Sequence, residues 1–186
     1  MNKLFLSALV FLYLPLTAQA ATEVKEKQQV LKMMRQYITL VSCDGLIEGD
    51  YKKSDTEAMK NIYTVEKDSD TSVYYVLWHG DMGCAGGSGT TSNFVTEVAK
   101  YGSWKPLSIQ NDSAFGDIEI NFRFVQGIKK VSQTKFEIIS RDYADEKYGG
   151  KDGGMNFPAN KFRYTVERER FEPWKIINQA LLEQNN

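Results

Sequence analysis

Two β-prone segments joined by a glycine-dense loop, between Val73 and Gly102, constrain the fold of this chain more than any other stretch. The segments Thr71–Trp78 and Ser92–Lys100 are rich in Val, Tyr, Phe and Thr, the residue types that favour strands. The loop between them contains Cys84 and several glycines. The sequence therefore predicts two strands connected by a long, glycine-rich loop, around which the rest of the domain is organised.

The chain contains two cysteines, Cys43 and Cys84. In an oxidising compartment they allow one intramolecular pairing, whereas two free thiols are disfavoured there. The bridge would close a loop of about 41 residues, which the chain-entropy model values at on the order of 4 kcal/mol. We therefore expect a disulfide that fastens the end of the first predicted helix to the glycine-rich loop.

The first residues have the pattern of a cleaved secretory signal peptide. An apolar run from Leu4 to Leu16 is followed by small residues, Ala18 and Ala20, at the positions that signal peptidase reads. The run is about 13 residues long, shorter than the roughly 20 apolar residues that cross a bilayer as a helix. We expect residues 1–20 to be removed, residues 21–186 to form a single domain, and the protein to be periplasmic or secreted with no membrane span.

Charge is nearly balanced, with 23 Lys and Arg against 24 Asp and Glu distributed along the chain. Binding to nucleic acid or to an anionic membrane surface calls for a concentration of basic residues. We therefore expect neither a nucleic acid nor a membrane surface as a partner.

A helix is expected from Thr22 to about Val41, a stretch without Gly or Pro in which apolar residues recur at helical spacing. Its core-facing stripe consists of Val30, Leu31, Met34, Tyr37, Ile38 and Val41. Ser54–Glu57 has the pattern of a capping box for a short helix. The β-prone residues Tyr63–Val65 favour the alternative, a strand from about Met59 to Glu66, which we adopt.

Later β-prone segments alternate with turn-forming residues, and the tail from Asn178 onward is expected to be frayed. The expected strands after the central loop are Ser92–Lys100, Leu107–Gln110, Ile118–Val131, Lys135–Tyr143, Phe162–Arg168 and Trp174–Ile177. Helix first and strands afterwards is an α+β pattern. The predicted fold is an N-terminal amphipathic helix packed on a mainly antiparallel β-meander sheet of about six to eight strands, with one disulfide.

The loop His79–Thr90 allows three interpretations. As a phosphate site it lacks the Gly-Lys-Ser/Thr ending and leads into a strand instead of a helix. As a hydrolase site it would use Ser88 as nucleophile with His79 and Asp81, but Thr90 stands where the nucleophile motif requires glycine. The third interpretation is a structural or recognition loop, in which glycines supply the turns and small polar residues form a surface.

A metal site has little support. A zinc centre needs at least three ligands, and the chain offers one His besides two cysteines that are better used in a bridge. Asp142, Asp145, Glu146 and Asp152 crowd a glycine-rich segment without the spacing of an EF-hand. Calcium binding in the 142–152 segment is left open, and no metal or cofactor is expected.

The leading hypothesis is a non-catalytic, exported binding protein that acts on another envelope or secreted macromolecule, for instance as an inhibitor or immunity protein. This hypothesis rests on the expected export, the small size, the expected disulfide and the absence of a complete catalytic motif from the sequence. The residues expected to form the recognition loop are His79, Asp81, Ser88, Thr90 and Thr91. The alternatives are a periplasmic hydrolase using Ser88, His79 and Asp81, and a carrier that encloses a small apolar ligand between helix and sheet.

Overall fold

The computed structural model describes residues 14–47, 50, 54–87, 90–142, 160–169 and 172–184, with side chains from Thr22 onward. Within these ranges the chain forms two α-helices, one 3-10 turn and nine strands. In chain order they are α1 (Leu14–Val41), β1 (Ser42–Ile47), α2 (Asp55–Met59), β2 (Ile62–Lys67), β3 (Thr71–Met82), β4 (Ser92–Tyr101), β5 (Ser108–Asn111), η2 (Phe122–Phe124), β6 (Val125–Lys130), β7 (Lys135–Asp142), β8 (Asn160–Glu167) and β9 (Lys175–Gln184).

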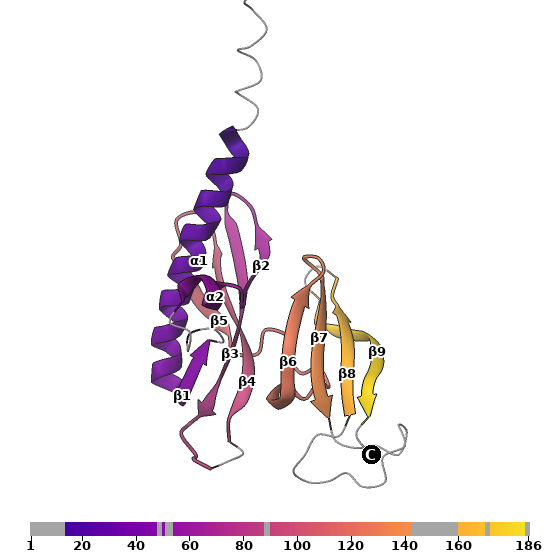
Figure 1. Cartoon of the computed structure of the whole chain (residues 1–186). Coiled ribbons are helices and arrows are strands. Elements are labelled where there is room, and N and C mark those ends of the chain that lie inside the picture. The colour runs from indigo at the N-terminus through magenta and orange to yellow at the C-terminus, as the bar shows by residue number, and fades with distance from the viewer. Residues whose placement is uncertain are drawn as a thin grey trace, which may run out of the picture.

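The strands form two antiparallel sheets, and α1 lies along the five-stranded one (Figure 1). In that sheet, called sheet A, β3 pairs with β4 along one side and with β2 and then β1 along the other, and β5 adds to β4. Sheet B contains β6, β7, β8 and β9 in chain order. The resulting layers are helix, sheet A and sheet B.

Strand β3 is the centre of the packing because both of its faces are buried. Successive side chains of a strand point to opposite faces, so Tyr74, Val76 and Trp78 face α1 while Tyr75 and Leu77 face sheet B. A strand buried on both faces reads as a continuous apolar run in the sequence. This arrangement explains why Thr71–Trp78 is the most β-prone segment of the chain.

The layer between α1 and sheet A is filled by side chains. Val30, Leu31, Met34 and Ile38 of α1 are each buried to within 2% exposure. They form one cluster with the helix-facing residues of β3 and with Val98 of β4. The buried indole of Trp78 satisfies its polar group by donating from Nε1 to Thr96 Oγ1 at 2.9 Å.

Sheets A and B meet through an aromatic cluster. The ring of Tyr75 lies 5.3 Å from that of Phe115, 5.8 Å from that of Phe136 and 6.2 Å from that of Trp174, centre to centre. Trp174 Nε1 donates to the Tyr75 hydroxyl at 3.1 Å, so the buried polar groups of both rings are paired. Aromatic contacts of this kind add about 1 kcal/mol each beyond the area they bury.

A buried carboxylate holds the N-terminal half of α1 on sheet A. Glu26 is 9% exposed and accepts hydrogen bonds from Ser72 Oγ at 2.9 Å and from the Tyr74 hydroxyl at 2.7 Å. Lys67 Nζ bonds to the same oxygen as these two hydroxyls, and Lys100 Nζ lies 2.6 Å from the other oxygen. Burial alone would favour the neutral acid, but these four donors together lower the pKa of Glu26 to about 2.

The α+β class, the N-terminal helix, the antiparallel strands and the disulfide are confirmed. The strands form two sheets, whereas the sequence indicated a single β-meander sheet. The capping box and the neighbouring strand both exist, because α2 begins after Ser54, whose hydroxyl accepts from the Glu57 N–H, and β2 follows it. No helix in the described part of the chain is long and apolar enough to cross a bilayer.

Two expectations about strands were wrong, and one strand was missed. The segment Ile118–Val131 is not one strand, since only Val125–Lys130 pairs with β7 and η2 precedes it. The tail is not frayed from Asn178, because β9 continues to Gln184 along β8. Strand β1 was not expected at all, and it pairs with β3 just after α1 ends.

Candidate functional site

The candidate site is the β3–β4 loop, residues 83–91, together with the strand ends that support it. Figure 1 places this loop at the end of sheet A that is far from the N-terminus of α1. Every residue from Met82 to Gly87 is exposed. Ser88 and Gly89 lie outside the described residues.

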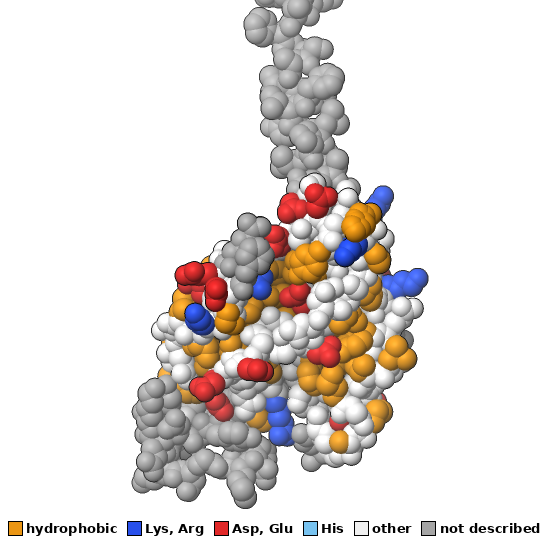
Figure 2. Space-filling model, turned by 180° about the vertical axis from the view of Figure 1, so that it is seen from behind, with side chains coloured by type: hydrophobic (Ala, Val, Ile, Leu, Met, Phe, Trp, Pro, Cys, Tyr) orange, Lys and Arg blue, Asp and Glu red, His pale blue; other side chains and the backbone are white. Residues whose placement is uncertain are grey.

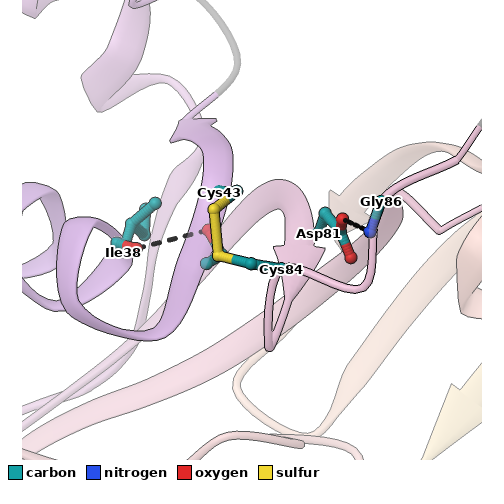
Figure 3. Close-up of a disulfide and its surroundings, with 6 residues drawn as sticks. Ile38, Cys43, Asp81, Cys84 and Gly86 are labelled. Atoms are coloured by element: carbon teal, nitrogen blue, oxygen red, sulfur yellow. Dashed lines mark hydrogen bonds between the residues drawn. A yellow bond between two sulfur atoms is a disulfide. The ribbon is translucent and has the colours of Figure 1, made fainter.

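A disulfide fastens this loop to β1 at the end of α1 (Figure 3). Cys43 and Cys84 are joined at an S–S distance of 2.02 Å with their Cα atoms 5.1 Å apart. The pairing expected from the sequence is therefore present, and it links the loop to the strand that directly follows the helix.

Hydrogen bonds to the backbone hold the first half of the loop in one conformation. The Gly83 N–H donates to the Val41 carbonyl at 3.1 Å, and the Cys84 N–H donates to the Asp81 carbonyl at 3.2 Å. The Asp81 carboxylate accepts from the Gly86 N–H at 2.8 Å (Figure 3). A loop with a covalent anchor and three such bonds has few other conformations available.

Two glycines allow β1 to approach β3 closely beneath the end of α1. A Cβ atom on Gly80 would lie 2.6 Å from Ser42 Oγ and 2.9 Å from the backbone Cα of Gly45. A Cβ atom on Gly45 would lie 2.0 Å from the same Ser42 hydroxyl. Sequence reasoning missed the role of these two glycines. The only indication in the sequence was that Gly45 lies two residues after Cys43 and Gly80 lies four residues before Cys84.

Residues with positive φ stand at both ends of the disulfide. Cys84 has φ 56°, and Asp44, next to Cys43, has φ 51°. Such values are uncommon for residues other than glycine and cost of order 1–3 kcal/mol unless the surroundings enforce them. The bridge and the neighbouring hydrogen bonds supply that constraint, so the loop conformation is imposed by its anchors.

The structure separates the residues that the sequence grouped in one loop. His79 and Asp81 belong to β3, on the same side of the strand as Tyr75 and Leu77, and not to the loop itself. Asp81 is 8% exposed and is engaged by Gly86, while His79 is half-buried opposite Asn93. Thr90 donates its hydroxyl to the Gly87 carbonyl at 3.1 Å, and Thr91 is exposed.

This placement bears on the hydrolase and metal interpretations. No hydrogen bond joins His79 to Asp81 in the described structure, and Ser88 has no described position. Among the described side chains, no group of three or more His, Cys, Asp or Glu could hold a metal ion. The proposed calcium segment falls on residues that the structure does not describe beyond Asp142.

The surface charges are scattered on the face shown in Figure 2, where acidic and basic side chains alternate with apolar ones. Nothing on that face gathers one sign of charge into a patch.

A comparison of the chain with protein-family models, curated proteins and solved structures finds no significant match.

Proposed function

We propose that the protein is an exported, non-catalytic binding protein that recognises another envelope or secreted protein through the β3–β4 loop, as an inhibitor or immunity protein does. One observation carries the proposal. The loop is exposed from Gly83 to Gly87 and at Thr91, and it is held by a disulfide and by hydrogen bonds on both sides of Cys84.

Preorganisation is the physical reason that such a loop favours binding. Ordering a free loop during association costs roughly 0.5–1.5 kcal/mol for each immobilised rotamer-rich side chain, in addition to backbone entropy. Here the backbone is already fixed and the described loop residues are small, so little further ordering is required. The binding energy of any contact is then largely retained.

The chemistry of the loop indicates the shape of the partner. Its described residues, Gly83–Gly87 together with Thr90 and Thr91, carry no charge and no large side chain. A narrow, neutral loop of this kind fits a concave surface, where backbone N–H and C=O groups make the contacts. A hydrolase cleft in the cell envelope is a surface of that type.

Site-specific photo-crosslinking tests the proposal. A photoreactive residue at Ala85, exposed in the loop, is expected to give one stoichiometric adduct with an envelope or secreted protein. The matched control carries the same residue at Asn178, which is exposed on β9 in sheet B. Equal labelling from both positions, or none from Ala85, contradicts the proposal.

Unlabelled protein should compete with the Ala85 adduct, and the purified partner should bind the Cys43→Ser, Cys84→Ser double variant at least tenfold more weakly. The loss follows from the entropy of a released loop and not from a lost contact. If the double variant folds and binds as tightly as the parent protein, the anchored loop is not the recognition element.

A further inference from the structure

A cleft lies at the other end of β3 from the β3–β4 loop. Its volume is about 460 Å³, and its floor includes Val65 and Val73, both buried in the core between the sheets. Nine residue steps of β3 lie between Val73, which lines the cleft, and Met82, where the loop begins, so the two are separated by roughly 30 Å. A site here is therefore distinct from the one proposed above and does not depend on it.

Arg168 presents an unpaired guanidinium in this cleft. Its guanidinium carbon lies 4.7 Å from the centre of the Trp174 ring, and its backbone N–H donates to the Thr134 carbonyl at 3.0 Å. No carboxylate of the described residues lies within ion-pair distance of it. Stacking occupies the flat face of a guanidinium and leaves the N–H donors at its edge available for a ligand.

Glu97 presents a carboxylate in the same cleft. One of its oxygens accepts from the Tyr101 hydroxyl at 3.0 Å, and no cation in the described structure pairs with it. Burial, followed by the charge of Glu97, raises the pKa of Tyr101 to about 12. Tyr101 therefore stays protonated at neutral pH and holds the carboxylate in place.

Arg168 and Glu97 thus face one cleft without pairing with each other, because each is held by a neutral partner. Lys67 also lines the cleft, but its ammonium group is engaged by Glu26 on the other side of sheet A. Glu66 and Asp68 add two further carboxylates to the lining. The cleft therefore offers acidic acceptors, one planar cationic donor and an apolar floor between them.

We propose that this cleft binds a small zwitterion, a free amino acid or a short peptide, whose carboxylate contacts Arg168 and whose ammonium group contacts Glu97. The bidentate geometry of a guanidinium suits a carboxylate, and the acidic side of the cleft suits an ammonium group. The carbon chain of the ligand spans the cleft between these two groups.

A series of unbranched amino acids measures the separation between the two charged groups of the site. Glycine, β-alanine, 4-aminobutyrate, 5-aminovalerate and 6-aminohexanoate differ only in the separation of their two charges, and glycylglycine adds a peptide bond. Calorimetric titration of the oxidised protein is expected to show one optimal length. That ligand should bind at least tenfold more tightly than the acid or the amine of the same length alone.

Two variants and a matched control locate the binding. Arg168→Gln and Glu97→Gln should each lower the affinity for the best ligand at least tenfold. Arg163→Gln, at an exposed position on β8, should leave that affinity unchanged. Far-ultraviolet circular dichroism confirms that each variant is folded. The Cys43→Ser, Cys84→Ser variant should bind as the parent does, which separates this site from the loop.

Three results of the ligand titrations would overturn the proposal. The first is an affinity that does not change with the chain length of the ligand. The second is equal affinity for the analogues that carry a single charge. The third is the absence of binding by the series and by the twenty protein amino acids at concentrations on the order of 10 mM. Binding that survives both Arg168→Gln and Glu97→Gln would place the ligand elsewhere.

Discussion

The C-terminal end of α1 and its middle are fastened to sheet A by different chemistry. At the C-terminal end the chain passes directly into β1, and the Cys43–Cys84 disulfide joins β1 to the end of β3. Nearer the N-terminus, Glu26 is held by two lysines, a serine and a tyrosine. The C-terminal end is held by a covalent bond and the middle by a buried charge.

The two anchors respond differently to redox state and to pH. A disulfide stabilises mainly by restricting the unfolded chain, so its contribution depends on redox state and little on pH. A buried ion cluster acts in the folded state and depends on the ionisation of its members. The two anchors can therefore be released separately, and four predictions follow from this, in order of decreasing effect.

Removing the disulfide with Cys43→Ser, Cys84→Ser should lower the free energy of unfolding by about 4 kcal/mol, the chain-entropy value for a 41-residue separation. Denaturant unfolding at pH 7 and pH 5 measures it, and the loss should be equal at both pH values. Amide exchange should accelerate at Gly83 and Gly86. A loss confined to one pH would show that the bridge is not acting on the unfolded chain.

Replacing Glu26 by Gln should lower the free energy of unfolding by about 3 kcal/mol at pH 7, because it leaves Lys67 and Lys100 without their carboxylate. Folding lowers the pKa of Glu26 to about 2, so its contribution is complete above pH 5 and is lost as pH falls toward 2. The difference between parent and variant should therefore shrink on acidification.

Chemical denaturation across pH 2–7 measures that difference, with the disulfide variant as control. A constant gap between the parent protein and Glu26→Gln over this range would show that the carboxylate is not ionised in the way the cluster indicates.

Gly80→Ala tests the close approach of β1 to β3 beneath the disulfide. The added Cβ would meet the backbone of Gly45 at 2.9 Å, and overpacking of this kind costs about 2 kcal/mol. Thermal unfolding should show the loss, with Gly127→Ala as control because a Cβ there meets nothing within 4 Å. Equal stability of the two variants would mean that the strands separate without cost.

Glu23→Gln is the surface counterpart of the Glu26 change, three residues earlier on α1. Glu23 is more than a third exposed, lies 3.7 Å from Lys27 and accepts from the Thr64 hydroxyl. Exposed pairs contribute at most about 1 kcal/mol and are screened by salt, so the change in unfolding free energy should be under 1 kcal/mol. An effect as large as that of Glu26→Gln would show that burial does not separate the two acids.

The sequence was sufficient to predict elements with a strong apolar period. The core-facing stripe of α1 was identified because its apolar residues repeat every 3.6 residues. Strand β3 was identified because its apolar residues form a continuous run. Edge strands were missed or shortened for the opposite reason. Strand β9 is mostly exposed and has two register shifts against β8, so Asn178–Gln184 shows no alternation that a reader could follow.

Close packing of backbone was equally hidden. Gly45 gives no sign in the sequence that the approach of β1 to β3 requires it. Gly80 made His79 and Asp81 look like loop residues, although β3 continues through them to Met82. The charged cleft could not be found at all, since Glu97 and Arg168 are far apart in the sequence and share no motif.

The two cores on the faces of β3 each contain one tryptophan. Trp78 lies in the layer beneath α1 and Trp174 between the sheets, while Trp104, in the turn after β4, is 72% exposed. Indole emission depends on the polarity around the ring, so variants that keep a single tryptophan would give each layer its own fluorescence signal. Loss of the helix layer and separation of the sheets could then be timed independently in one unfolding experiment.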